Sequence, residues 1–290
     1  MRGNPKFMRQ PPSFWALVRT LSEHLKYTNR SRKGTPKGSG TVKVHTVGEQ
    51  ALALSELGLD PTLVLRDGNA TELGQLLEQY FAYRADVLMT AAEPNLMDAE
   101  DAKRLFEEVR ARVKPPATCP LPQNKQKGAM SAPAYLTGLV NMLVHEAVGG
   151  HPCNYNPGQL TTFTRNGIPL RTLSRRVDGA FPSVVNPIAL WEIKEYYYTT
   201  TFGSRVADGV YETLLDGMEL EEIEQNEGVR AEHLLIIDSR YTWWVCGKSY
   251  LCRMVDMVNM GVVSEVIFGR EVVERMPLLA RSWVEKLRSL

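Results

Sequence analysis

The chain has 290 residues, of which 43% are hydrophobic and 23% are charged, and its formal net charge is +1. This composition is typical of a globular protein of one or two domains, and it excludes no partner, because a near-neutral total can contain a local basic patch. Four scattered cysteines without a Cys-x-x-Cys pair argue against a zinc ribbon or a disulfide framework, and no run reaches the roughly 18 apolar residues of a membrane span, so we expect a cytoplasmic protein without a membrane partner.

The first third of the chain is predicted to be helical. The segment SFWALVRTLSEHLKY carries apolar side chains at helical spacing. TVGEQALALSELG begins with a capping box formed by Thr46 and Glu49, and the same logic places further helix starts at Asn69 and at Asp98. We therefore expect a helical N-terminal subdomain over residues 1–113.

A different order of elements follows a proline-rich segment. Residues 114–132 contain most of KPPATCPLPQNKQKGAMSAP, which has hardly any periodicity and is predicted to be a linker. Residues 133–290 then indicate a mixed α/β layer fold. Its expected elements are a helix ending on Gly149-Gly150, strands around 160–165, 170–178 and 188–196, a helix over 204–225, strands at 233–238 and 263–269 with a helix between them, and a closing helix.

The most informative stretch is IALWEIK, an apolar strand that ends in charged residues. Because side chains alternate along a strand, Glu192 and Lys194 project to one face and Ile193 to the other. A hairpin would bring Asp178, on the preceding predicted strand, beside them. Two carboxylates can hold a hard cation such as Mg²⁺ through their oxygens. Lys194 could then orient or help deprotonate a metal-bound water that attacks a phosphodiester.

An Asp followed, across a strand-to-strand gap, by Glu-x-Lys resembles the PD-(D/E)xK nuclease superfamily, the fold of many restriction endonucleases. The resemblance covers about residues 131–270, and the order of predicted elements agrees with it. It implies that residues 133–290 form a restriction endonuclease-like mixed-sheet core of order αβββαβ. It also implies a metal-dependent endodeoxyribonuclease. The sequence departs from the pattern at Val177, where the superfamily has its leading proline.

The resemblance also implies roles for individual residues. Asp178 and Glu192 would bind Mg²⁺, with Mn²⁺ able to substitute, and Ile193 would lend its backbone carbonyl to the metal. Lys194 would serve the nucleophile. Many members use a further Glu on the helix before the strands, and Glu146 in NMLVHEAVGG stands at that place.

Two groups of basic residues are candidates for contacts to double-stranded DNA. A flexible loop without acidic residues can follow a phosphate backbone, and arginines near the proposed centre can position phosphates. The candidates are Arg30, Arg32, Lys33 and Lys37 in the loop, and Arg171, Arg175 and Arg176 ahead of Asp178. By analogy we expect a homodimer, since two-fold symmetry suits two antiparallel strands. An enzyme of restriction type would have a cognate methyltransferase as its partner, and the N-terminal helices would supply recognition or dimerisation.

Two other functions are compatible with the sequence. The chain could be a non-catalytic DNA-binding protein on a nuclease-like scaffold. It could also be a zinc hydrolase that uses His145, Glu146 and His151, although these histidines are six apart rather than the four of HExxH, and paired glycines separate them. A purely structural interpretation remains for the motif itself, in which Glu192 and Lys194 form an ordinary ion pair and Asp178 belongs to a turn. Asp208 is then an alternative carboxylate.

Overall fold

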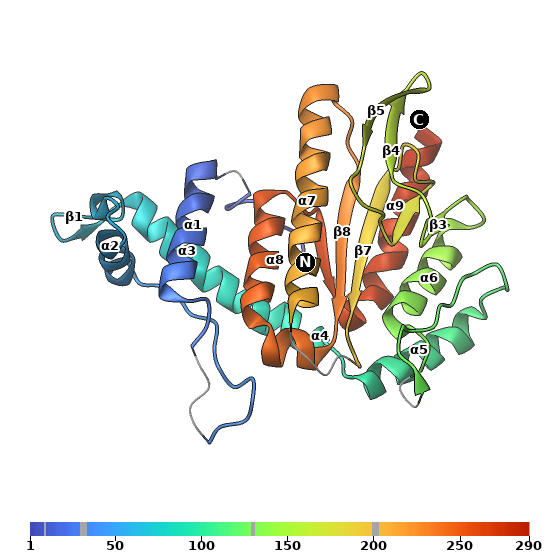
Figure 1. Cartoon of the computed structure of the whole chain (residues 1–290), viewed down its shortest axis with the longest axis horizontal. Helices are drawn as coiled ribbons and strands as arrows, with labels where there is room; N and C mark the ends of the chain where they lie inside the picture. The colour runs from blue at the N-terminus through green and yellow to red at the C-terminus, as the bar shows by residue number, and fades with distance from the viewer. Residues whose placement is uncertain (9, 30–33, 129–130, 199–202, 290) are drawn as a thin grey trace.

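The computed structural model describes residues 1–8, 10–29, 34–128, 131–198 and 203–289 of the chain. Its centre is a five-stranded sheet with helices on both faces, and helices from the first third of the chain extend away from one side of it (Figure 1). The architecture is therefore mixed α/β, as the order of predicted elements indicated. Within these ranges no helix combines the length and apolarity needed to cross a membrane.

The N-terminal third consists mainly of helices, as expected. They are α1 (Pro12–Leu25), α2 (Val47–Glu56), α3 (Glu72–Val87), α4 (Glu93–Asn95) and α5 (Ala99–Val113), with a short hairpin of β1 (Leu65–Arg66) and β2 (Asn69–Ala70) before α3. The capping box is confirmed, because Thr46 Oγ1 accepts from the N–H of Glu49 and the Glu49 carboxylate accepts from the N–H of Thr46. Asp98 likewise caps α5 by accepting from two backbone N–H groups of its first turn.

The predicted helix start at Asn69 was wrong by two residues. Asn69 pairs with Arg66 in the β1–β2 hairpin, so its backbone belongs to a strand and not to a cap. The cap is Thr71, whose Oγ1 accepts a hydrogen bond of 3.0 Å from the N–H of Gly74. A threonine hydroxyl satisfies one of the unpaired donors at the start of a helix as an asparagine would.

The central sheet has the strand order β3-β6-β7-β8-β9. Neighbours β3, β6 and β7 are antiparallel, whereas β7, β8 and β9 run parallel. The strands are β3 (Asn154–Tyr155), β6 (Gly179–Phe181), β7 (Ala189–Glu195), β8 (Glu232–Asp238) and β9 (Glu265–Phe268). The predicted strands at 188–196, 233–238 and 263–269 are thus confirmed with small shifts at their ends.

The other two predicted strands lie outside this sheet. They form a separate hairpin of β4 (Thr162–Arg165) and β5 (Ile168–Thr172). The strand expected over 170–178 was therefore too long and wrongly placed, because β5 ends at Thr172 and its backbone bonds to β4. The antiparallel neighbour of β7 is β6, which begins one residue after Asp178.

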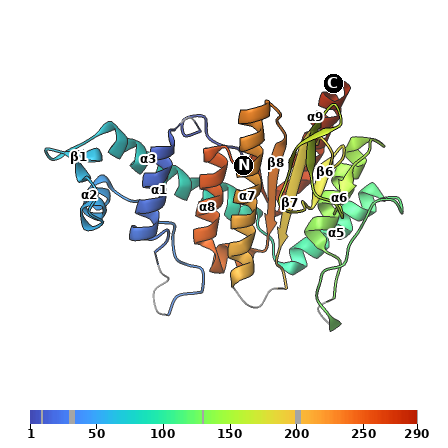
Figure 2. The ribbon, with the colours of Figure 1, turned by 45° about the horizontal axis from the view of Figure 1, so that its top comes forward.

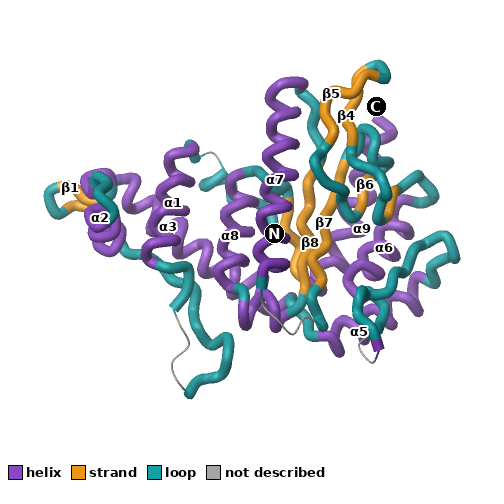
Figure 3. The backbone as a smooth tube through the Cα atoms, viewed as in Figure 1, coloured by secondary structure: helices purple, strands orange, loops and turns teal. Residues whose placement is uncertain are grey.

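The two faces of the sheet carry different helices. One face is covered by α6 (Tyr135–Val148) and α9 (Val272–Ser289), with α5 packed on α6, and the other by α7 (Ser204–Glu227) and α8 (Lys248–Met260) (Figure 2). The strands form one layer between these helices (Figure 3). Alternation along β7 buries Trp191 and Ile193 in the core beneath α6, whereas Leu190 packs with side chains of α7. Glu192 and Lys194 consequently face α7.

Helix α5 and the segment that follows it pack against α6, which covers one face of the sheet. The ring of Phe106 on α5 lies so close to Gly138 on α6 that a Cβ there would stand 2.5 Å from Phe106 Cε2. Cys119 is buried in the same core, and Asn141 of α6 donates to the carbonyl of Pro120 over 2.9 Å. Around Cys119 and Pro120, the segment expected as a linker therefore lies against α6.

A buried ion pair connects the N-terminal helices to the rest of the molecule. Arg84 on α3 has no exposed surface, and its Nη1 lies 3.2 Å from Asp256 on α8. The hydroxyl of Tyr80 donates to the same carboxylate over 2.5 Å, and Arg84 Nη2 donates to Ser22 of α1 over 3.0 Å. Three helices are thereby joined through one buried guanidinium.

Candidate active site

Asp178 is held beside β7 by the backbone of that strand. The N–H of Asp178 donates to the carbonyl of Trp191 over 3.0 Å, which continues the β6–β7 pairing by one residue. In return, the N–H of Ile193 donates to Asp178 Oδ2 over 2.7 Å. The Asp178 carboxylate is therefore fixed next to the segment that carries Glu192 and Lys194.

Glu192 and Lys194 lie together on the α7 face of the sheet. Glu192 is 1% exposed, and its Oε2 stands 3.1 Å from Lys194 Nζ. The side chain of Ile193 packs on the opposite face, as the alternation predicted. The structure thus brings Asp178, Glu192 and Lys194 to one place.

Two carboxylates of α7 and one arginine complete this group. Glu212 Oε2 lies 2.8 Å from Lys194 Nζ, and Asp216 Oδ2 lies 2.6 Å from Nη1 of Arg175. Sequence reasoning missed Glu212 and Asp216, although their spacing of four residues on a helix places them on one face. We call the charge cluster the set of Asp178, Glu192, Lys194, Glu212, Asp216 and Arg175.

Burial and mutual charge perturb the carboxyl groups of the charge cluster. Burial, and after it the charge of Glu192, raises the pKa of Asp178 to about 6. Burial also raises the pKa of Asp216 to about 7, in spite of Arg175 beside it. Such shifts are common where carboxylates are gathered for a functional purpose. Both groups therefore change protonation close to neutral pH.

Lys194 is held in its charged form. Burial acts to lower the pKa of this amine, but Glu192 and Glu212 outweigh it, and the pKa is raised above its ordinary value. Burial similarly acts to raise the pKa of Glu212, yet the bond and charge of Lys194 lower it. Lys194 is consequently an ammonium group that donates hydrogen bonds.

The carboxylates of the charge cluster are possible oxygen ligands for a cation, and the sequence motif assigns this role to two of them, Asp178 and Glu192. Within the described ranges, no three Asp, Glu, His or Cys side chains are arranged to hold a metal ion as they stand. Asp216 Oδ1 is buried without a hydrogen-bond partner, and Glu192 Oε2 is buried with the Lys194 ammonium 3.1 Å away. Mg²⁺ commonly takes one or two protein carboxylates and completes its shell with water and phosphate. Asp178 and Glu192 supply two carboxylates of this kind, and Arg175 and Lys194 contact the two oxygens of Glu192.

Glu195 does not belong to the charge cluster. It follows Lys194 on β7 and points to the other face, where Thr137 at the start of α6 donates to it through its N–H (3.1 Å) and its hydroxyl (3.2 Å). Burial raises the pKa of Glu195 to about 7. Its position indicates a helix cap.

The expected role of Glu146 was wrong. This residue is exposed near the end of α6, and its carboxylate lies 3.9 Å from Arg112 of α5. Because α6 covers the face opposite Glu192, Glu146 cannot reach the charge cluster. The zinc arrangement of His145, Glu146 and His151 is not formed either, because no group of three or more described His, Cys, Asp or Glu side chains could hold a metal ion. Asp208 is exposed on α7, outside the charge cluster.

The candidate DNA-binding residues occupy different environments. Arg30, Arg32 and Lys33 lie outside the described residues. Lys37 is exposed in a loop that Lys248 holds through the carbonyls of Gly38 and Gly40.

The three arginines ahead of Asp178 also differ from one another. Arg171 is paired with Glu219 at 3.0 Å and with Glu222 at 2.9 Å, so α7 neutralises its charge. Arg175 belongs to the charge cluster. Arg176 is exposed.

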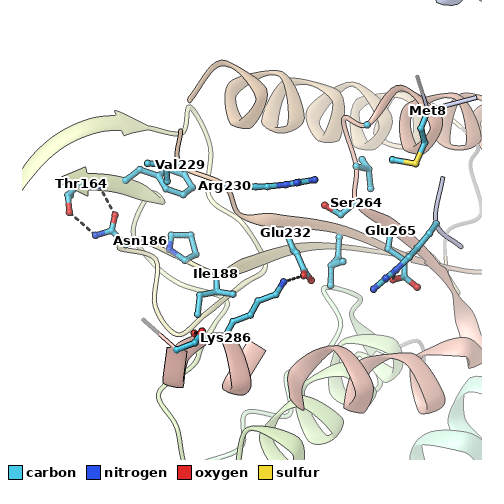
Figure 4. A pocket seen from close by; sticks show the side chains of 17 residues that line it. Met8, Thr164, Asn186, Ile188, Val229, Arg230, Glu232, Ser264, Glu265 and Lys286 are labelled. Carbon is cyan, nitrogen blue, oxygen red and sulfur yellow. Dashed lines mark hydrogen bonds and ion pairs between the residues drawn. The ribbon is translucent and has the colours of Figure 1, made fainter. Parts of the chain in front are cut away.

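A separate cavity of about 780 Å³ opens at the other end of the parallel strands. Ile188, Glu232 and Ser264 line it near the starts of β7, β8 and β9, with Arg230 on one side and Lys286 bound to Glu232 on the other (Figure 4). The residues of the charge cluster are not among those that line this cavity.

Two family models match the chain. One, described as Domain of unknown function (DUF7687), matches residues 97–283, and the other, described as Domain of unknown function (DUF7690), matches residues 1–91. No curated protein matches the chain, and neither does any solved structure. The matched segments meet ahead of α5, in agreement with the packing of α5 on the helices of the sheet.

Proposed function

The chain belongs to the family described as Domain of unknown function (DUF7687), and we propose that it is a Mg²⁺-dependent endonuclease that hydrolyses phosphodiester bonds of double-stranded DNA. One observation carries the proposal: Asp178, Glu192 and Lys194 stand together where β6 and β7 pair, with Ile193 N–H bonded to Asp178 and Lys194 Nζ 3.1 Å from Glu192. This closeness supports a shared role for the three residues.

The order of elements supports the same proposal. Helix α6 is followed by the antiparallel strands β3, β6 and β7, by α7, and by β8, which is parallel to β7. This order is similar to the αβββαβ core of the PD-(D/E)xK superfamily, with the β4–β5 hairpin inserted between the first two strands. Strand β9, the helices α8 and α9 and the N-terminal helices would be additions to that core.

Each residue of the centre has a role that follows from its environment. Asp178 and Glu192 would hold Mg²⁺, which supplies a more acidic bound water and a counter-charge for phosphoryl oxygens when it is bound. Ile193, which lies between Glu192 and Lys194 in the chain, would lend its backbone carbonyl as a further oxygen. Lys194 is charged and donates hydrogen bonds, so it would orient the attacking water and balance charge rather than remove a proton.

DNA would approach the charge cluster past the exposed Arg176, with Lys37 and its loop as a second basic contact. We propose that the protein is a restriction or phage-defence enzyme that acts as a homodimer. In the restriction case it would have a cognate methyltransferase as its partner. The helices of residues 1–91 would serve recognition or dimerisation. RNA is the control substrate, because phosphate contacts alone do not select DNA.

The test is cleavage of supercoiled plasmid by the purified protein with Mg²⁺, beside an EDTA control. The variant Lys194→Met removes the ammonium from the charge cluster. Lys286→Met is the matched control, because Lys286 pairs with Glu232 away from the cluster. EDTA-sensitive cutting that Lys194→Met loses and Lys286→Met keeps supports the proposal. Equal cutting by both folded variants overturns it.

A non-catalytic DNA-binding protein is the second candidate. Its support is the number of ion pairs inside the charge cluster, since Glu192 already meets Arg175 at 2.7 Å and Lys194 at 3.1 Å. Such a network can be purely structural. Salt-sensitive DNA binding without cleavage, in both Mg²⁺ and Mn²⁺, is the result that would favour this candidate.

A further inference from the structure

Arg175 occupies the centre of the charge cluster. Its Nη1 lies 2.7 Å from Glu192 Oε1 and 2.6 Å from Asp216 Oδ2, and its Nη2 lies 3.3 Å from Glu212. The residue comes from the segment between β5 and β6, three positions before Asp178. One guanidinium therefore connects the sheet to α7.

The guanidinium and a divalent cation would compete for the same carboxylate. Arg175 donates to one oxygen of Glu192, the buried residue whose carboxylate the proposed metal site needs. A positive charge at hydrogen-bond distance from that carboxylate repels a second cation there. Arg175 as placed thus opposes metal binding.

Arg175 has partners besides Glu192, and the charge cluster contains more carboxylates than cationic side chains. Asp216 and Glu212 on α7 can retain the guanidinium after it leaves Glu192. The charge cluster holds four carboxylates against two cationic side chains, Asp216 Oδ1 is buried without a hydrogen-bond partner, and Glu192 Oε2 has the Lys194 ammonium 3.1 Å away. Because the carboxylates outnumber the cationic side chains around them, the charge balance of the cluster leaves room for a further cation.

We propose that Arg175 is a displaceable counter-cation that regulates metal binding at the proposed nuclease centre. In the arrangement seen here it satisfies Glu192. When a divalent cation binds Asp178 and Glu192, Arg175 withdraws to Asp216 and Glu212, or to a phosphate of the substrate. This inference rests on the proposed function, because it requires that Asp178 and Glu192 bind a metal.

The test is calorimetric titration of the full-length protein with Ca²⁺, a probe that reports binding without cleavage. The variant Arg175→Gln removes the competing charge. Arg171→Gln is the matched control, since Arg171 also pairs with carboxylates of α7 but does not contact Glu192. Glu192→Gln removes the proposed ligand. Arg175→Lys, which cannot bridge Glu192 and Asp216 through one planar fork, is a second variant if Arg175→Gln does not fold.

We expect Arg175→Gln to bind Ca²⁺ about tenfold more tightly than the unmodified protein, which corresponds to about 1.4 kcal/mol. Arg175→Lys should change affinity in the same direction by less, Arg171→Gln should leave it unchanged, and Glu192→Gln should abolish binding. Unchanged or weaker binding by the Arg175 variants, with binding still dependent on Glu192, overturns this inference alone. Absence of Ca²⁺ binding in every folded variant overturns the proposed function together with it.

Discussion

The N–H of Ile193 donates a hydrogen bond of 2.7 Å to Asp178 Oδ2, so the strand that carries Glu192 and Lys194 also fixes the carboxylate opposite them. The donor is a backbone N–H and the acceptor is the short side chain of Asp178, so the bond does not depend on the rotamer of a long side chain. This arrangement places the carboxylates of Asp178 and Glu192 side by side. It costs folding free energy, because their charges repel and both groups are largely removed from water.

Because the repulsion and the burial of the Asp178 charge destabilise the folded protein, we predict that Asp178→Asn is more stable than the unmodified protein. Asparagine can keep the bond from Ile193 without the charge. The folded-state pKa of about 6 exceeds the ordinary 3.8, so the folded protein binds this proton more tightly than the unfolded chain. The resulting stabilisation is complete below the ordinary value and is lost as pH rises through about 6.

Asp178→Asn should therefore raise the free energy of unfolding relative to the unmodified protein, by roughly 1 kcal/mol more at about pH 7.5 than at about pH 5. Urea denaturation at both pH values measures this difference. A variant that is less stable at neutral pH than the unmodified protein would show that Asp178 contributes a favourable ion pair instead.

Gly179, the residue after Asp178, is predicted to be intolerant of a side chain. A Cβ there would stand 2.0 Å from Cε2 of Trp191, and Trp191 is stacked on Trp283 with ring centroids 5.6 Å apart. Gly179→Ala should destabilise the protein by about 1–3 kcal/mol, as overpacking of a core does. Gly158→Ala, which meets nothing within 4 Å, is the control in thermal melting. Equal melting temperatures would contradict the packing described here.

Asp256→Asn tests the connection between the N-terminal helices and α8. The substitution leaves the guanidinium of Arg84, which has no exposed surface, without its carboxylate. Loss of one partner from a buried ion pair typically costs about 3–5 kcal/mol. Glu23→Gln, which removes the exposed partner of Arg253, should cost less than about 1 kcal/mol. Similar losses for both variants in urea denaturation would count against a buried connection.

The cap of α3 gives a prediction about a single hydroxyl. Thr71→Ala should cost about 1 kcal/mol of stability, because the N–H of Gly74 loses its acceptor. Asn69→Ala should change stability far less, since Asn69 lies in the exposed hairpin. Chemical denaturation of the two variants measures both losses of stability. A larger loss for Asn69→Ala than for Thr71→Ala would indicate that Asn69 caps the helix.

Local patterns predicted much of the fold, and long-range packing accounts for what they missed. The side chains of Glu192 and Lys194 face one way because alternation along a strand is a local property. Which strand a given strand pairs with depends on residues far along the chain. The strand expected over 170–178 was therefore wrongly assigned to the central sheet, although β5 pairs with β4. The metal-binding role expected for Glu146 was wrong for a similar reason, because the sequence of α6 does not indicate which face of the sheet this helix covers.

The charge cluster was only partly predictable. Asp178, Glu192 and Lys194 could be proposed from their spacing and from the family resemblance. Glu212 and Asp216 lie on a helix far along the chain, and only their spacing of four residues hints at a shared face. Arg175 was expected to contact DNA, whereas the structure places it among three carboxylates. Its environment depends on how α7 packs on the sheet, which no local pattern reveals.

The most direct measurement is the rate of plasmid cleavage by the unmodified protein and by Lys194→Met in Mg²⁺, with folding of both verified by thermal melting. If the charge cluster is a metal-dependent phosphodiesterase centre, loss of the ammonium should slow cutting by about a hundredfold or more, and EDTA should stop the unmodified protein. Cleavage that persists in EDTA, or that proceeds equally fast without the Lys194 ammonium, would contradict the account.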